Sequence, residues 1–134
     1  MNSALVMILL IGIWPFSSGK TYHMKASNSV PAATGTVSVQ KNSNNGNTQL
    51  DIKVNNLAKP SSLTPPENVY IVWVRPHDGT AVKSGAIGVD KNLNGELKVV
   101  TVSKNFEVFI TAEQSPSVTE PTGTVVLDAN VDVG

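Results

Sequence analysis

Apolar and polar residues alternate in short runs along much of the chain, and clusters of Asn, Gly and Pro separate these runs. Residues 36–40 and 49–54 show the alternation most regularly, since every second residue is Val, Leu or Ile. A period of two residues buries one face of a β-strand. Asn45 and Gly46 lie between the two runs and favour the positive φ angles of a hairpin turn. The pattern therefore predicts two antiparallel strands joined by a hairpin.

The remaining runs extend this pattern to a complete all-β domain. Residues 57–68 contain three prolines, which cannot continue a hydrogen-bonded ladder, so they are expected to cross between two sheets. Residues 69–74 are apolar on both faces, as in a central strand. Further strands are expected at 21–25, 81–89, 96–102, 106–113 and 124–131, and 106–113 should be half-buried with Glu113 on its outward, solvated face.

Strands of this number and spacing predict an immunoglobulin-like antiparallel β-sandwich of about seven or eight strands. The large apolar residues of the central strands are its expected core. These are Tyr70, Trp73, Phe106, Val108, Ile110 and Leu127.

The N-terminal residues predict an export signal. Residues 4–14 form an unbroken apolar run of a length typical of a signal-peptide core and too short to span a membrane. Ser17 and Gly19 then provide a small-x-small cleavage site, although the segment before the run lacks Lys and Arg. We therefore expect residues 1–19 to be a signal peptide, and 20–134 to be a single exported domain, periplasmic or secreted, with no stable membrane insertion.

Composition excludes several classes of protein. The 10 Lys+Arg residues balance the 10 Asp+Glu residues, which removes the electrostatic attraction that nucleic-acid binding needs. The chain has no Cys, so disulfides, thiolate metal sites and cysteine nucleophiles are excluded. No assembled nucleophile and base is evident from the sequence. We expect a protein that is not an enzyme and that binds no cofactor.

Two weak metal-binding patterns remain open. Asp90, Asn92 and Asn94 match the first half of a calcium loop, whereas a hairpin turn at Asn94-Gly95 explains the same residues. His23, with Met24, would suit copper if His77 joined them across the fold. We expect neither set to be a metal site.

Two loops are the candidate interaction surface. Residues 75–79 follow the Trp73 strand, and residues 115–123 precede the last strand. Loops on a rigid scaffold commonly carry function, and we expect these two at the same end of the sandwich. Their candidate contact residues are Arg75, His77, Asp78, Glu120 and Thr122.

A family resemblance rests on motifs in residues 66–131. They are the strand Val69-Tyr70-Ile71-Val72-Trp73-Val74, the glycines Gly85 and Gly88, the strand Phe109-Ile110-Thr111-Ala112-Glu113, and the turn Pro121-Thr122-Gly123 before the last strand. In order and spacing this half of the chain resembles the extracytoplasmic C-terminal domain of the anti-sigma-K factor family. The resemblance implies an extracytoplasmic β-sandwich.

Direct sigma-factor inhibition does not follow from this resemblance. In that family, sigma binding belongs to a separate helical domain, which this sequence does not show. The expected role is that of a protein-interaction or sensory module of the bacterial cell envelope, which binds an unknown envelope protein or self-associates. The alternative is a small envelope protein that binds calcium or copper.

Overall fold

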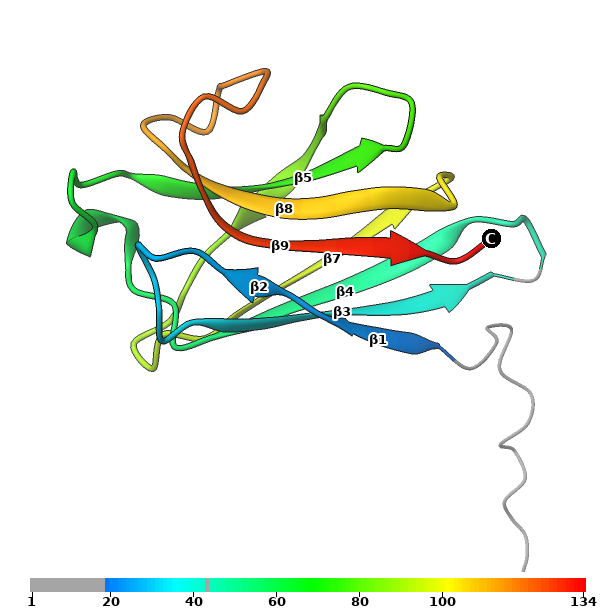
Figure 1. The fold of residues 1–134 in the computed structure, drawn as a ribbon, viewed down its shortest axis with the longest axis horizontal. Helices are drawn as coiled ribbons and strands as arrows, with labels where there is room; N and C mark the ends of the chain where they lie inside the picture. The colour runs from blue at the N-terminus through cyan, green and yellow to red at the C-terminus, as the bar shows by residue number, and fades with distance from the viewer. Residues whose placement is uncertain (1–18, 43) are drawn as a thin grey trace, which may run out of the picture.

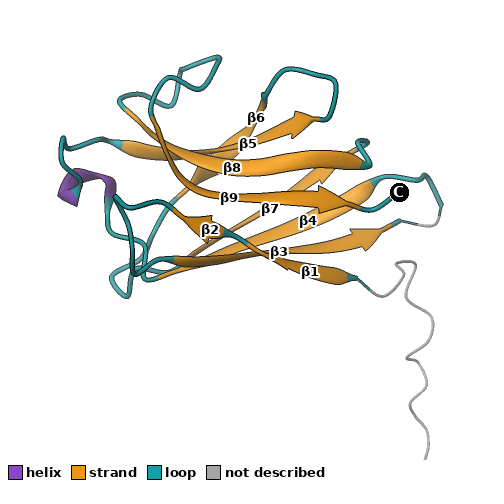
Figure 2. Cartoon of the chain, in the orientation of Figure 1, coloured by secondary structure: helices purple, strands orange, loops and turns teal. Residues whose placement is uncertain are grey.

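The structure, a computed structural model, describes residues 19–42 and 44–134. The predicted signal peptide lies almost wholly outside the described residues. The strands are β1 (Lys20–His23), β2 (Lys25–Ala26), β3 (Thr34–Lys41), β4 (Thr48–Asn55), β5 (Val69–Pro76), β6 (Val82–Ile87), β7 (Gly95–Thr101), β8 (Asn105–Glu113) and β9 (Thr124–Asp132). Between β4 and β5, the described chain forms one 3₁₀ turn, η2 (Pro60–Ser62) (Figure 2). The described part of the chain contains no helix able to cross a membrane.

The strands form two antiparallel sheets packed face to face (Figure 1). The four-stranded sheet has the order β1-β3-β4-β7, and the five-stranded sheet has the order β2-β9-β8-β5-β6. The prediction of an all-β sandwich is therefore confirmed. The expected first edge strand is divided between the sheets, because β1 pairs with β3 while β2, beyond the buried Met24, pairs with β9.

The predicted hairpin and crossing loop are both present. Strands β3 and β4 pair in register, and the backbone N–H of Gly46, with φ of 74°, donates to the Asn42 carbonyl in the turn. Residues 56–68 then carry the chain from the four-stranded to the five-stranded sheet. The hydroxyl of Tyr70 donates to the Ala58 carbonyl and fixes this crossing, and burial raises the pKa of Tyr70 to about 12.

The main core lies between the sheets. Alternate residues of β3 and β4 meet alternate residues of β5, β8 and β9, as the period of two requires. Among the expected core residues, those found in this main core are Tyr70, Phe106, Val108, Ile110 and Leu127.

Trp73 is buried on the opposite face of the five-stranded sheet. It forms a second apolar cluster with Ile71 and Phe109, and the Trp73 and Phe109 rings stack with centroids 6.5 Å apart. Strands β5 and β8 are therefore buried on both faces, and β8 is not the half-buried strand expected from its alternation. The loops beyond β5 and β8 cover the cluster, because Ala81 and Val118 pack against it.

Candidate functional site

The loop of residues 114–123, between β8 and β9, folds over the outer face of the five-stranded sheet (Figure 1). Its two ends are held together by Glu113, the last residue of β8, whose side chain is only 1% exposed. One carboxylate oxygen of Glu113 accepts hydrogen bonds from the backbone N–H groups of Thr122 (3.2 Å) and Gly123 (3.1 Å). The other accepts from the Thr122 hydroxyl at 2.7 Å. We call this arrangement the Glu113 clasp.

The clasp continues into the apolar cluster through Thr111. The Thr111 hydroxyl donates to the Glu113 carboxylate at 2.6 Å and accepts from the indole N–H of Trp73 at 2.8 Å. A single chain of hydrogen bonds thus joins β5, β8 and the far end of the loop. Because every member is paired, the buried polar groups carry no unsatisfied hydrogen-bond cost here.

Glycine is required where the loop returns to the sheet. A Cβ atom at Gly123 would overlap the carbonyl oxygen of Ala112. At the middle of the loop, Val118 packs on the apolar cluster, and the Lys83 ammonium group donates to the Pro116 carbonyl at 2.8 Å. The loop is therefore fixed at its end, at its middle and against the β6 edge.

The hydrogen bonds of the clasp favour the ionised form of Glu113. Burial alone would raise its pKa, but the hydrogen bonds from Thr111, Thr122 and Gly123 together hold the pKa below its ordinary value. The sequence-based expectation that Glu113 is a solvated surface charge is wrong. Alternation places it on the outer face, as expected, but the loop then covers it.

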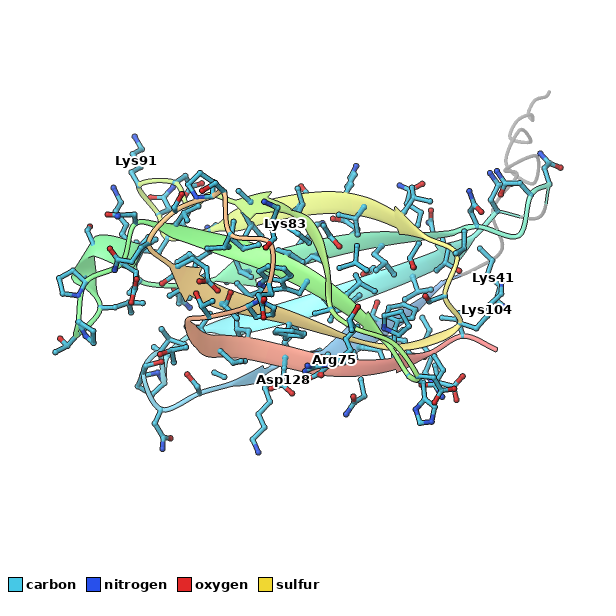
Figure 3. All side chains as sticks on the ribbon, turned by 90° about the horizontal axis from the view of Figure 1, so that it is seen from above. Lys41, Arg75, Lys83, Lys91, Lys104 and Asp128 are labelled. Carbon is cyan, nitrogen blue, oxygen red and sulfur yellow. The ribbon has the colours of Figure 1, made fainter. Side chains whose placement is uncertain are left out.

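Charged residues lie beside the covered cluster on the same face (Figure 3). Arg75 donates two hydrogen bonds to one oxygen of Glu107, at 2.7 and 3.2 Å, and its guanidinium lies 4.6 Å from the centroid of the Phe109 ring. Asp128 pairs in register with Phe109 on one side and with Lys25 on the other. Burial and the nearby Glu107 raise the pKa of Asp128, and Lys25 lowers it in part.

The two candidate interaction loops lie at opposite ends of the sheet. Strand β5 runs antiparallel to β8, with Val69 opposite Glu113 and Pro76 opposite Phe106. Residues 77–79 therefore leave one end, and the loop that follows Glu113 leaves the other (Figure 1). The expectation that they share one end is wrong.

The loop residues themselves differ in their surroundings. His77 and Asp78 are exposed in their turn, with 3.7 Å between imidazole and carboxylate. Glu120 is exposed as well, whereas Thr122 is tied into the clasp.

The calcium-like residues form a self-contained turn. One carboxylate oxygen of Asp90 accepts hydrogen bonds from the backbone N–H groups of Asn92 (2.8 Å) and Asn94 (3.0 Å). The positive φ of this turn, 65°, falls on Leu93 and not on the expected Asn94-Gly95 pair. Gly95 is instead a strand residue, where a Cβ would overlap the Gly88 carbonyl oxygen.

The copper-like residues are not brought together. His23 is on β1 of the four-stranded sheet, Met24 is buried, and His77 follows β5 of the other sheet. Within residues 19–42 and 44–134, no group of three or more His, Cys, Asp or Glu side chains is placed to hold a metal ion.

A shallow hollow of about 610 Å³ lies beside the β4–β7 pair. Its charged lining comes from Lys53, Asp90 and Glu96, and Asp90 is already engaged in its own turn. This hollow offers no evident nucleophile and base.

No family model matches the chain, and no curated protein matches it. The resemblance to the anti-sigma-K domain therefore stays a prediction. Several residues that carry it are now seen to share one structural task, because Trp73, Thr111, Glu113, Thr122 and Gly123 all belong to the clasp. The sequence signal that could have found this coupling is Thr-x-Glu at the end of a strand, followed ten residues later by Gly before the next strand.

Proposed function

We propose that this protein is an exported, non-enzymatic protein-interaction module of the bacterial cell envelope. Its binding surface is the loop of residues 114–123, and the observation that carries the proposal is the Glu113 clasp. A buried carboxylate, a buried tryptophan and a required glycine all act to hold one surface loop in a single conformation. Such preorganisation lowers the entropy cost of binding.

The exposed residues of the loop suit recognition of a protein. Ser117, Thr119 and Glu120 are exposed and offer hydrogen-bonding groups and one negative charge on the clasped loop. The zero net charge of the chain supports a protein partner over a nucleic acid. The exported location and the envelope setting are supported by the apolar run at residues 4–14 and by the resemblance to an extracytoplasmic domain.

The test is site-specific photo-crosslinking in intact cells. A photoreactive residue at Thr119 is compared with one at Gln40, which is also exposed but lies on the four-stranded sheet. We expect one defined envelope protein to be crosslinked from position 119 and not from position 40. We also expect the crosslink to weaken when Glu113→Gln loosens the loop. Equal crosslinking from both positions, or none from 119, would contradict the proposal.

The same samples test export. Mass spectrometry of the purified chain should find Lys20 at its N-terminus, after cleavage of the predicted signal peptide. A chain that retains residues 1–19 in the cytoplasm would contradict the proposed location.

A further inference from the structure

The four edges of the two sheets are protected to different degrees. Strands β1 and β2 are only four and two residues long, and the β6 edge is irregular, because a register shift leaves Ser84 of β6 without a partner in β5 and Gly85 has φ of 152°. Short strands and bulges protect sheet edges against pairing with other chains. Strand β7 has neither protection, because its seven residues pair with β4 without a register shift.

The outer side of β7 is free of backbone partners in the described chain. No turn or loop hydrogen bond involves the backbone of residues 96–101, so the groups of β7 that point away from β4 have no backbone hydrogen-bond partner among the described residues, although β6 of the other sheet lies beside this strand. The strand contains no proline, and Val100 at its end is 64% exposed. A regular, unpaired strand of this kind is a template for β-augmentation.

The charged residues of β7 favour a second copy of the same chain as the pairing partner. Glu96 and Lys98 lie on the same outward face, and within one chain they are opposite Lys53 and Asp51 of β4. If the β7 of a second copy pairs antiparallel about a two-fold axis at Leu97, Glu96 of each copy lies opposite Lys98 of the other. Each row across the joined sheets then reads Lys53, Glu96, Lys98 and Asp51, with the last two from the second copy. The charges alternate in sign across all four strands, which is favourable for directly opposed residues.

Other registers lack this complementarity. An axis at Lys98 places two lysines directly opposite each other, which is unfavourable. An axis at Val99 places Lys98 opposite Val100 and leaves the charge unpaired. With the axis at Leu97, by contrast, Leu97 of one copy lies opposite Leu97 of the other. Both side chains face inward and already pack against the core of their own chains.

The two neighbouring carboxylates of Asp51 and Glu96 also favour pairing of β7 with a second copy about Leu97. Burial, followed by the neighbouring Glu96 carboxylate, raises the pKa of Asp51, whereas Lys53 and Lys98 lower it in part, and one oxygen of Asp51 is buried without a hydrogen-bond donor. A lysine from a second copy beside Glu96 would further offset the repulsion between the two carboxylates.

We propose that the protein forms a homodimer in which the β7 strands of two copies pair antiparallel about Leu97 and join the two four-stranded sheets into one. This goes beyond the proposed function, because the dimer uses a different sheet from the loop that contacts an envelope partner.

The test uses single cysteines, because the chain has none of its own. The variants Glu96→Cys and Lys98→Cys are purified separately and then mixed under oxidising conditions. In the proposed register the two positions are directly opposed, at a Cα separation of about 5 Å that a disulfide can bridge. Identical positions are diagonal neighbours, about 7–8 Å apart, and exceed the usual span. We expect disulfide-linked dimers from the mixture and few from either variant alone.

Charge reversal provides the second measurement, by analytical ultracentrifugation of the full chain. Glu96→Lys alone and Lys98→Glu alone should each raise the dimer dissociation constant at least about tenfold, and a mixture of the two should restore the dimer. Lys91→Glu, in an exposed turn, is the matched control and should leave dimerisation unchanged. Thermal melting followed by circular dichroism confirms that each variant is folded.

Each alternative outcome overturns the dimer. A native chain that is monomeric up to about millimolar concentration refutes it, and so does a dimer in which the Glu96→Cys and Lys98→Cys chains fail to crosslink. Crosslinking of Glu96→Cys with Val100→Cys instead would reveal the Lys98 register and refute the proposed one. Because Glu113→Gln should leave the dimer intact, failure of the dimer and failure of the loop interaction are distinguishable.

Discussion

Truncation of the buried carboxylate by Glu113→Ala tests whether the clasp holds the loop of residues 114–123. The change removes the acceptor for four hydrogen bonds. The two hydroxyl donors, on Thr111 and Thr122, can turn toward other acceptors. The backbone N–H groups of Thr122 and Gly123 cannot, and these two groups determine the cost.

The expected loss of stability in Glu113→Ala follows from the number of donors left without an acceptor and from how deeply they are buried. A buried donor without a partner costs about 1–3 kcal/mol, which gives about 2–6 kcal/mol for two donors. Thr122 lies at the surface, so water reaches these groups once the loop loosens. The cost therefore falls at the lower end, about 2–3 kcal/mol. In Glu113→Gln, the amide oxygen can still accept from Thr111 and from the backbone N–H groups of Thr122 and Gly123, and the Thr122 hydroxyl can turn to accept from the new NH2 group. This change should cost about 1 kcal/mol, because it mainly removes the charge assistance.

Urea unfolding followed by circular dichroism measures this loss. With the usual slope for a domain of this size, Glu113→Ala should lower the urea midpoint by about 1–2 M. Hydrogen exchange provides a local readout, since the amides of residues 114–123 should exchange faster. The matched control is Glu120→Ala, the same substitution at an exposed position of the same loop, which should stay within about 0.5 kcal/mol of the native chain. If Glu113→Ala matches this control in both measurements, the carboxylate does not anchor the loop.

Three further substitutions or conditions test neighbouring claims. Because the pKa of folded Glu113 lies below its ordinary value of 4.5, its contribution to stability is present above that pH and is lost as the pH falls through the folded pKa; Glu113→Gln should flatten this part of an acid-unfolding curve. Gly123→Ala should destabilise the fold by about 2 kcal/mol in urea unfolding, since its Cβ would overlap the Ala112 carbonyl oxygen, and an unchanged midpoint would contradict the close approach. Leu93→Asn should raise the free energy of unfolding in urea by about 0.5–1 kcal/mol, because Asn tolerates the positive φ of 65° that Leu93 adopts. A loss of stability would show that the Leu93 side chain contributes more than its backbone strain costs.

Local periodicity was enough to predict most of the fold. The hairpin of β3 and β4 and the proline-rich crossing at residues 56–68 depend on neighbours in sequence, so a period of two and a cluster of turn residues identify them. The Trp73 strand shows where this information ends. A strand that is apolar on both sides gives no indication of which face meets the other sheet, and only the register with β8 places Trp73 beside Phe109 on the outer face.

The clasp was missed for a different reason. Alternation correctly assigned Glu113 to the outward face, and an outward carboxylate is usually solvated. What buries it is the loop of residues 114–123, whose path depends on Val118 packing against side chains from β5 and β8. The positions of the two candidate loops, however, could have been derived from the sequence, because antiparallel pairing of the Trp73 strand with the 106–113 strand already places residues 77–79 and 114–123 at opposite ends.

The outer faces of the two sheets differ, and each carries one of the two proposed contacts: the loop of residues 114–123 for an envelope partner, and β7 for a second copy. On the five-stranded sheet, a covering loop converts the outer face of β5 and β8 into a second core, so recognition there must come from the loop. The four-stranded sheet keeps a bare outer face, on which Lys53, Asp51, Glu96 and Lys98 lie in opposed pairs up to the free edge at β7. A substitution at Glu113 should therefore disturb the first contact without the second, and one at Lys98 should do the reverse. A variant at either position that abolished both contacts would show that the two faces do not act separately.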